Sequence, residues 1–278
     1  MVLQVLPHRR SLAILVGLNA GVVAAGCFAQ STSAAMIASD NAANYTGAIS
    51  TGSTGGTGFE AWTVTTSGSG SMGNYLDASS KGIATNTKSW GTYANTGTNP
   101  RIDLTRPFET SAGGSGGTLR AGQTFSVAME SDGVGNSGAL GFSLQSSSPI
   151  NQFTFEFDGA AGYNNMSIID GSNSGKEYQS PVALPFTSYI GKGMTVNFTL
   201  VTSSTYDLSV TPVGGSPVTV ITNGTLPGGA INQADLFDQN TNGNGYFNSI
   251  SIVPEPASLG LMAIGGLALL LVGRRKTA

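Results

Sequence analysis

The sequence predicts an all-β domain, an antiparallel β-sandwich or jelly roll, and three observations support this. Apolar and polar residues alternate in short runs, which is the pattern of strands with one buried face. Asn, Gly, Ser and Pro separate these runs, as expected of tight turns. Charged residues make up only 10% of the chain and 40 of its 278 residues are glycine, a composition that disfavours long helices.

The N-terminus, residues 1–29, predicts a signal-peptide helix that directs export. A charged stretch at residues 8–10 precedes an apolar run from Leu12 to Ala25, and small residues offer a cleavage point just after Ala29, with Ala34 or Ala35 as later options. Cys27 leaves a second outcome open, because a cysteine at this position could be lipidated and become the first residue.

The β-sandwich domain is predicted to span residues 30–252. Its leading segment, 31–58, is polar and rich in turns, and the Gly- and Ser-rich stretch 111–117 is typical of a long loop. Aromatic runs at 59–65 and 88–93 predict the first strands. The clearest period-two strands follow, with the apolar sets Phe125, Val127, Met129; Leu140, Phe142, Leu144; Phe153, Phe155, Phe157; Met194, Val196, Phe198, Leu200; Tyr206, Leu208, Val210; Val218, Val220; and Ile250, Ile252.

The composition of this domain excludes several functions. The one cysteine, Cys27, and the one histidine, His8, lie in the predicted signal peptide, so the mature domain has no Cys nucleophile, His base or Cys/His zinc site. Between residues 30 and 253 there are seven basic and fourteen acidic side chains, a net charge of about −7. Such an acidic domain repels phosphate backbones, and we expect no nucleic-acid partner.

The C-terminus, residues 253–278, has three parts in sequence. The tetrapeptide 253–256 contains two prolines, which hold the junction extended. The apolar run 257–273 predicts a single transmembrane helix, about 25 Å long at ~1.5 Å per residue. The basic end, 274–276, is expected to stay on the cytoplasmic side of the membrane.

These three parts resemble the PEP-CTERM sorting signal of Gram-negative bacteria, motif by motif. The resemblance implies that an exosortase in the inner membrane processes the chain at the motif Val253, Pro254, Glu255 and Pro256. It implies that the basic stop is Arg274, Arg275 and Lys276, and that the chain passes through an inner-membrane intermediate to the cell surface or the extracellular matrix. The helix and basic end alone also fit a permanent single-pass anchor, which stays open as the final state.

The body of the chain resembles the concanavalin A-like and laminin-G-like sandwiches. The residues that carry this likeness are 58–62 (Gly-Phe-Glu-Ala-Trp), 88–91 (Lys-Ser-Trp-Gly), 141–144 (Gly-Phe-Ser-Leu) and 245–250 (Gly-Tyr-Phe-Asn-Ser-Ile). The resemblance implies a carbohydrate-binding role and nothing more specific.

Glu156 and Asp158 form the sharpest enzymatic pattern. On a strand, residues i and i+2 point the same way about 6.5–7 Å apart, within the range for paired carboxylates acting on a glycosidic bond. The likeness to laminarinase-type glycosidases implies a further Glu soon after, yet residues 159–162 are Gly and Ala, so a third carboxylate is absent there. We therefore expect a solvated polar face opposite the Phe153–Phe157 ladder, with no catalytic residue.

A pattern typical of the first half of a calcium-binding loop occurs at Asp238, Asn240 and Asn242, followed by Gly243. The twelfth position would be Ser249, where the loop needs a bidentate Glu, and one carboxylate is little charge for a divalent ion. A simple hairpin turn is the alternative, because Asn and Gly tolerate positive φ. We expect no cofactor, and calcium at these three residues is the alternative.

Aromatic residues could supply a sugar-stacking surface, although core packing is expected for most of them; they are Trp62, Trp90, Tyr93, Tyr163, Tyr178 and Tyr246. Taken together, the sequence predicts an exported, non-enzymatic, surface- or matrix-associated β-sandwich that binds extracellular polysaccharide. A divergent glycoside hydrolase using Glu156 and Asp158 is the alternative from another class, and a purely structural coat protein is a third.

Overall fold

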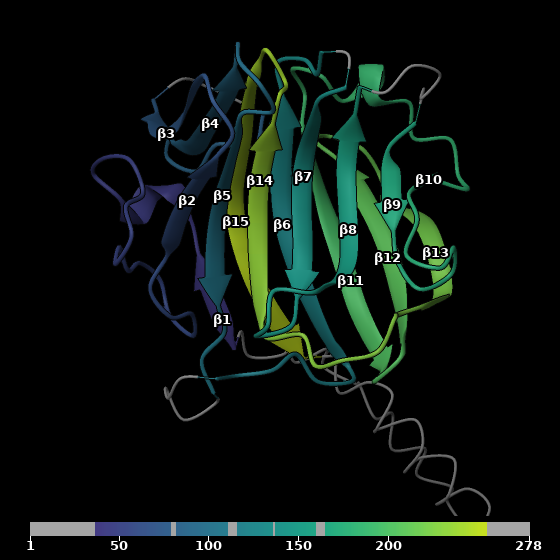
Figure 1. The fold of residues 1–278 in the computed structure, drawn as a ribbon. Coiled ribbons are helices and arrows are strands. Elements are labelled where there is room, and N and C mark those ends of the chain that lie inside the picture. The colour runs from purple at the N-terminus through teal and green to yellow at the C-terminus, as the bar shows by residue number, and fades with distance from the viewer. Residues whose placement is uncertain (1–36, 79–81, 111–115, 136, 160–164, 255–278) are drawn as a thin grey trace, which may run out of the picture. The chain divides into compact units, whose positions relative to one another are not determined.

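Two antiparallel sheets lie face to face in the computed structural model (Figure 1), which confirms the predicted all-β sandwich. The structure describes residues 37–78, 82–110, 116–135, 137–159 and 165–254. All of these belong to the compact unit Thr32–Ala278, and the predicted signal peptide lies outside them. In these ranges the helical structure consists of two 3-10 turns, Ala42–Asn44 and Phe186–Ser188. None of the described helices is long and apolar enough to span a membrane, and residues 257–273 lie outside the described ranges.

One sheet has eight strands in the described residues. Its order is β13 (Val218–Thr225), β12 (Thr205–Pro212), β11 (Met194–Thr202), β6 (Gln123–Ser131), β15 (Asn244–Pro254), β4 (Ser89–Asn95) and β3 (Ser71–Asp77), with β1 (Ala38–Asp40) also paired to β15. The other sheet has seven strands, in the order β10 (Tyr178–Gln179), β9 (Ser167–Ile169), β8 (Asn151–Asp158), β7 (Ala139–Gln145), β14 (Gln233–Gln239), β5 (Arg101–Pro107) and β2 (Thr63–Ser67).

The predicted apolar ladders fill the space between the sheets. Successive side chains on a strand point to opposite faces, so each ladder turns one whole face inward. Phe142 lies among aromatic neighbours from both sheets, with its ring centroid 5.7 Å from that of Phe125 and 5.9 Å from that of Phe153. Phe198 stacks on Tyr206 with centroids 4.9 Å apart. These five side chains are fully buried, and the other predicted core residues are buried too, except Val218, which is only partly buried at the edge strand β13.

The leading segment is more ordered than its polar composition predicts. Residues 38–40 form β1, which pairs with β15 in the register Ala38 to Ile252 and Asp40 to Ile250. The side chains of Tyr45, Ile49 and Trp62 are buried against the core. The segment therefore covers one end of the sandwich.

A buried arginine holds this segment in place. Arg106 lies on the inward face of β5 with no exposed surface, and its Nη2 is 3.4 Å from Oδ2 of Asp40. Its Nη1 and Nη2 also donate hydrogen bonds to the carbonyls of Ser53 and Gly55, at 3.3 and 2.8 Å. The guanidinium lies 4.9 Å from the ring centroid of Trp62. Asp40 is on the eight-stranded sheet and Arg106 on the seven-stranded sheet, so this ion pair joins the two.

Strand β15 continues beyond the predicted end of the domain. Val253 and Pro254, the first two residues of the sorting motif, are its last two residues and pair with Thr124 and Gln123 of β6. Glu255, Pro256 and the basic end 274–276 lie outside the described residues. The sorting motif thus begins inside a strand in the middle of a sheet.

We predict that Arg106→Ala lowers the free energy of unfolding by about 3–5 kcal/mol, because it leaves Asp40 as a buried charge without its partner. Arg120→Ala removes the same charge from an exposed position and is the matched control, expected to change stability by less than about 0.5 kcal/mol. Urea denaturation of the three proteins measures both effects. A loss below about 1 kcal/mol for Arg106→Ala would contradict the role given to this ion pair.

Candidate functional site

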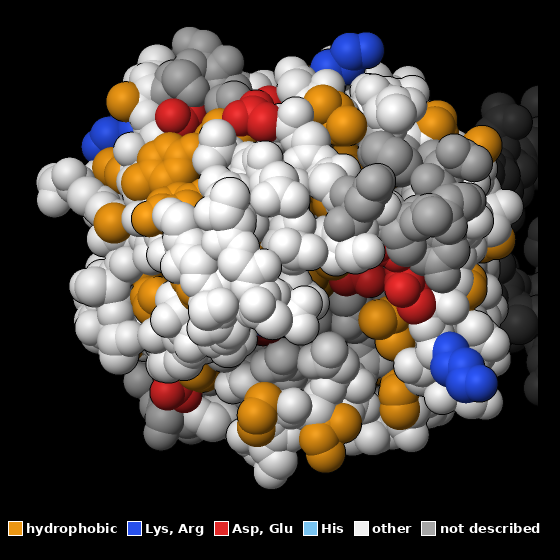
Figure 2. All heavy atoms as spheres, turned by 45° about the horizontal axis from the view of Figure 1, so that its top comes forward, with side chains coloured by type: hydrophobic (Ala, Val, Ile, Leu, Met, Phe, Trp, Pro, Cys, Tyr) orange, Lys and Arg blue, Asp and Glu red, His pale blue; other side chains and the backbone are white. Residues whose placement is uncertain are grey.

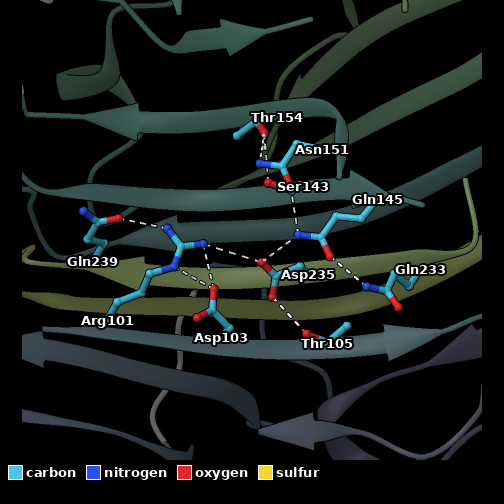
Figure 3. Close-up of polar contacts among 10 residues, drawn as sticks. All are labelled: Arg101, Asp103, Thr105, Ser143, Gln145, Asn151, Thr154, Gln233, Asp235 and Gln239. Carbon is cyan, nitrogen blue, oxygen red and sulfur yellow. Dashed lines mark hydrogen bonds and ion pairs between the residues drawn. The ribbon is translucent and has the colours of Figure 1, made fainter. Parts of the chain in front are cut away.

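The outward face of the seven-stranded sheet carries a band of polar side chains. The strand register aligns Asp103, Phe237, Gly141 and Glu156 in one row across β5, β14, β7 and β8. The next row contains Thr105, Asp235, Ser143 and Thr154. Figure 3 shows that polar side chains from these four strands point toward one another across the face. We call this band the polar face.

Arg101 is fixed at the centre of an ion-pair network. Its Nε and Nη2 both lie 2.7 Å from Oδ1 of Asp103, and its Nη2 is 3.6 Å from Oδ2 of Asp235. Its Nη1 donates to Oε1 of Gln239 at 2.9 Å. The guanidinium lies over the ring of Phe237, 4.4 Å from the centroid. These contacts hold a partly exposed cation in one orientation, with 28% of its side chain exposed.

Asp235 connects this cation to a chain of amides. Its Oδ1 accepts a hydrogen bond from Thr105 Oγ1 at 3.3 Å, and its Oδ2 accepts from Gln145 Nε2 at 3.4 Å. Gln145 Oε1 in turn accepts from Gln233 Nε2 at 2.8 Å. Burial, followed by the charge of Asp103, raises the pKa of Asp235 to about 7, and the charge of Arg101 opposes this shift.

A hollow lies over this network and gives a ligand access to it. Its volume is about 440 Å³, and it is lined by residues of β2, β5, β7 and β14 and by Ser147 and Pro149 of the β7–β8 loop. This volume is within the range of small-molecule sites in proteins. Arg101, Asp103, Thr105 and Gln145 all border the hollow, so their remaining hydrogen-bonding capacity faces it.

The two carboxylates singled out from the sequence lie on β8 beside the network, but they are buried. Glu156 is 6% exposed and Asp158 is 7% exposed, so the prediction of a solvated polar face on β8 is wrong. One reason is the glycine opposite Glu156. A Cβ atom added to Gly141 would lie 2.2 Å from the carbonyl oxygen of Phe155 and 2.6 Å from Cβ of Glu156, so only glycine lets β7 and β8 approach this closely here.

The third carboxylate, expected to be absent, comes from another part of the chain. Glu177 directly precedes β10 and lies beside Asp158, with which it shares a hydrogen bond. Its charge also acts on Glu156. The sequence contains no local signal for this neighbour, because Glu177 reaches β8 only through the pairing of β10 with β9 and of β9 with β8.

Crowding of these carboxyl groups changes their protonation. Burial, and then the charges of Glu177 and Asp158, raise the pKa of Glu156 to about 8. Burial and the hydrogen bond with Asp158 raise the pKa of Glu177 to about 7, while the Ser167 hydroxyl lowers it. Glu156 is therefore largely protonated at neutral pH, and its carboxyl group can donate a proton or a hydrogen bond.

The three residues of the calcium candidate make separate contacts. Asp238 has no exposed surface, and its carboxylate accepts hydrogen bonds from the hydroxyls of Thr241 at 2.7 Å and Thr92 at 3.1 Å. Burial raises its pKa to about 6, and these two hydrogen bonds oppose the shift. Asn240 donates to the carbonyl of Ser137.

The backbone of this loop favours the hairpin-turn alternative. Asn240 and Asn242 have φ of 51° and 56°, the left-handed region that turn residues adopt. Asn242 Oδ1 accepts from the backbone N–H of Thr96. In the described part of the chain, no three His, Cys, Asp or Glu side chains are placed to hold a metal ion.

The aromatic candidates divide between the core and the surface. Trp62 and Trp90 are each 1% exposed and pack edge to face, with centroids 5.4 Å apart, which confirms core packing for both. Tyr178 is half-buried and donates a hydrogen bond to Asp170. Tyr93 and Tyr246 lie on the eight-stranded sheet, and Tyr163 falls outside the described residues.

A protein-family model, the PEP-CTERM protein-sorting motif, matches residues 253–276. This motif is a sorting signal for exosortase processing, so the chain is an exported protein that is sorted through the membrane. No curated protein matches the sequence.

Several solved structures are similar in fold. The globular domain of calreticulin from T. cruzi is 12% identical, with 76% of this chain and 95% of that chain covered and a TM-score of 0.48. The catalytic domain of a glycoside hydrolase family 131 protein from Coprinopsis cinerea is 16% identical, with 70% and 84% covered and a TM-score of 0.44. A Bacillus subtilis protein of unknown function with a galectin-like fold is 9% identical, with 69% and 89% covered and a TM-score of 0.39. No ligand or activity of this chain follows from these likenesses.

We predict that the stability of the protein falls as the pH rises through about 8, and that Glu156→Gln reduces this fall. A carboxyl group with a raised folded-state pKa binds more protons when folded, so its stabilising effect is complete below its ordinary pKa of 4.5 and is lost as the pH rises through about 8. Between pH 5 and 9 the parent should lose roughly 1–3 kcal/mol more free energy of unfolding than the isosteric variant. Denaturant titrations across this range measure the difference, and parallel curves for the two proteins would contradict it.

Proposed function

We propose that this chain is a non-enzymatic, surface- or matrix-associated protein that binds neutral extracellular polysaccharide through the polar face of its seven-stranded sheet. The observation that carries the proposal is the Arg101 network beneath its hollow. A prearranged set of donors and acceptors, open to solvent and fixed by mutual hydrogen bonds, is the surface that sugar hydroxyls require.

The charge of this face favours neutral glycans. Arg101 is surrounded by Asp103 and Asp235, and the carboxyl groups of Asp158 and Glu177 lie on the same sheet. Anionic polysaccharides would be repelled by these carboxylates. Neutral sugars can both donate to the carboxylates and accept from the guanidinium and the amides of Gln145 and Gln233.

A divergent glycoside hydrolase is the second candidate, favoured by one observation. Glu156, protonated near neutral pH, is grouped with Asp158 and Glu177, and hydrolysis of a glycosidic bond needs one acid and one carboxylate. The burial of Glu156 and Asp158 argues for the first proposal, because an acid that is 6% exposed has little access to a glycosidic oxygen.

Surface or matrix location is proposed from the sorting motif and the position where it begins. Because β15 ends at Pro254, cleavage just beyond the motif would leave the sandwich complete. Mass spectrometry of protein recovered from the extracellular fraction of its native host tests this, and we expect a chain from near Gln30 to near Pro256. A mature chain that retains 274–276 would instead be permanently anchored in the membrane.

We predict that the mature domain binds at least one of a soluble β-glucan, a galactan and a mannan, and that Arg101→Ala weakens this binding about tenfold. Loss of a charged donor to a sugar hydroxyl costs about 1.5 kcal/mol, which corresponds to this factor. Isothermal titration of each polysaccharide measures the affinity. Arg120→Ala makes the same charge change at an exposed position away from the hollow and should bind as the parent does.

Two results would contradict this prediction. The absence of binding to every polysaccharide, with and without calcium, would remove the binding role and leave a structural coat protein. Release of reducing sugar from the same polysaccharides would favour the hydrolase, provided that Asp158→Asn abolishes the release.

A further inference from the structure

A cluster of three tyrosines lies on the outward face of the other, eight-stranded sheet. Tyr75 of β3 and Tyr93 of β4 have ring centroids 6.4 Å apart, with ring planes inclined by 39°. Tyr246 of β15 meets Tyr75 edge to face, also with centroids 6.4 Å apart. In Figure 2, hydrophobic side chains gather beside acidic ones on the side of the molecule where Figure 1 places β3 and β4.

Two glycines provide the space that the rings of Tyr75 and Tyr93 occupy. The register places Gly73 opposite Tyr93, and Gly91 opposite Tyr75. A Cβ atom added to Gly73 would lie 2.9 Å from Cζ of Tyr93, and one added to Gly91 would lie 2.4 Å from Cζ of Tyr75. Each ring therefore lies over the glycine opposite it, in space that a side chain at that position would fill.

Tyr246 supports this pair from one side. Its side chain is 3% exposed and packs with Ile83 and Ala128, and its hydroxyl donates to Oδ2 of Asp132 at 2.6 Å. Tyr75 and Tyr93 themselves are only partly buried. Tyr75 and Tyr93, here called the tyrosine platform, thus pack against Tyr246 and the facing glycines and remain partly exposed to solvent.

Acidic groups line the rim of this platform. The charges of Asp77 and Asp132 both act on Tyr75, whose pKa is raised first by burial and then by its neighbours. Asp132 is exposed and also accepts a hydrogen bond from Asn244 Nδ2 at 3.3 Å. Flat apolar faces beside hydrogen-bond acceptors match the two sides of a neutral sugar ring, its C–H face and its hydroxyl groups.

We propose that Tyr75 and Tyr93 form a second sugar-contact site, on the sheet opposite the polar face, which stacks against a pyranose ring of a neutral polysaccharide. This inference rests on the proposed function. Because the two sites lie on opposite outer faces, one chain would hold two separate stretches of polysaccharide. A single domain could then cross-link two polysaccharide chains of the matrix.

A purely structural use of the tyrosines is the competing explanation. Aromatic rings often cover glycines on edge strands, and β3 is the last strand of its sheet in the described residues. Covering a glycine requires any apolar side chain of sufficient size, whereas stacking requires the flat ring. Leucine and phenylalanine substitutions separate these two roles.

The experiment titrates Tyr75→Leu, Tyr93→Leu and Tyr93→Phe with the β-glucan, galactan and mannan, and records the thermal unfolding of each variant. We expect each leucine variant to lose about tenfold in affinity and Tyr93→Phe to stay within about twofold of the parent. Unchanged affinity in both leucine variants would overturn the inference. If Arg101→Ala alone weakens binding, the polar face keeps its role and this second site does not exist.

If the leucine variants lose stability, a variant with a larger aromatic ring still tests the inference. Tyr93→Trp retains the cover over Gly73 and widens the stacking face, and we expect it to bind at least as tightly as the parent. A weaker Tyr93→Trp protein with unchanged thermal unfolding would also overturn the inference. Failure of the parent to bind any polysaccharide would remove the proposed function, and with it both sites.

Discussion

The buried ion pair between Asp40 and Arg106 is the contact on which the rest of this sandwich depends. A charge without exposed surface is stable only when it is paired and hydrogen-bonded, and Arg106 obtains its partners from β1 and from the carbonyls of Ser53 and Gly55. The same contact joins the two sheets and folds the polar segment before Trp62 over the end of the core. The polar segment that begins with β1 thereby becomes part of the folded domain.

Strand β5 shows how the core and the candidate site are built from one short run. Its inward residues, Ile102, Leu104 and Arg106, are buried, while its outward residues, Arg101, Asp103 and Thr105, belong to the polar network. Inward and outward residues alternate along the strand, so the contacts that fix Arg106 in the core also fix the position and register of Arg101 on the outer face. Side-chain contacts therefore fix this strand on both of its faces.

Sequence patterns predict the parts of this structure that depend on local periodicity. The Phe153–Phe157 ladder and its counterparts on β6, β7 and β11 are core residues as predicted, since period-two alternation is a property of the strand itself. Burial of Arg106 and Glu156, and the approach of Glu177 to Asp158, depend on which strands become neighbours, and no local pattern records that. No local sequence pattern marks Tyr75 either, because the residue that makes room for its ring, Gly91, lies opposite it on the adjacent strand.

The position of Pro254 at the end of β15 also has a mechanical consequence. β15 is flanked by β6 on one side and by β4 and then β1 on the other, and the hydrogen bonds to these neighbours run across the strand axis. Tension applied to the chain beyond Pro254 would act along this axis, so these bonds would be sheared together and not peeled apart one at a time. A pull at this end of the domain would therefore meet the hydrogen bonds of three neighbouring strands at once.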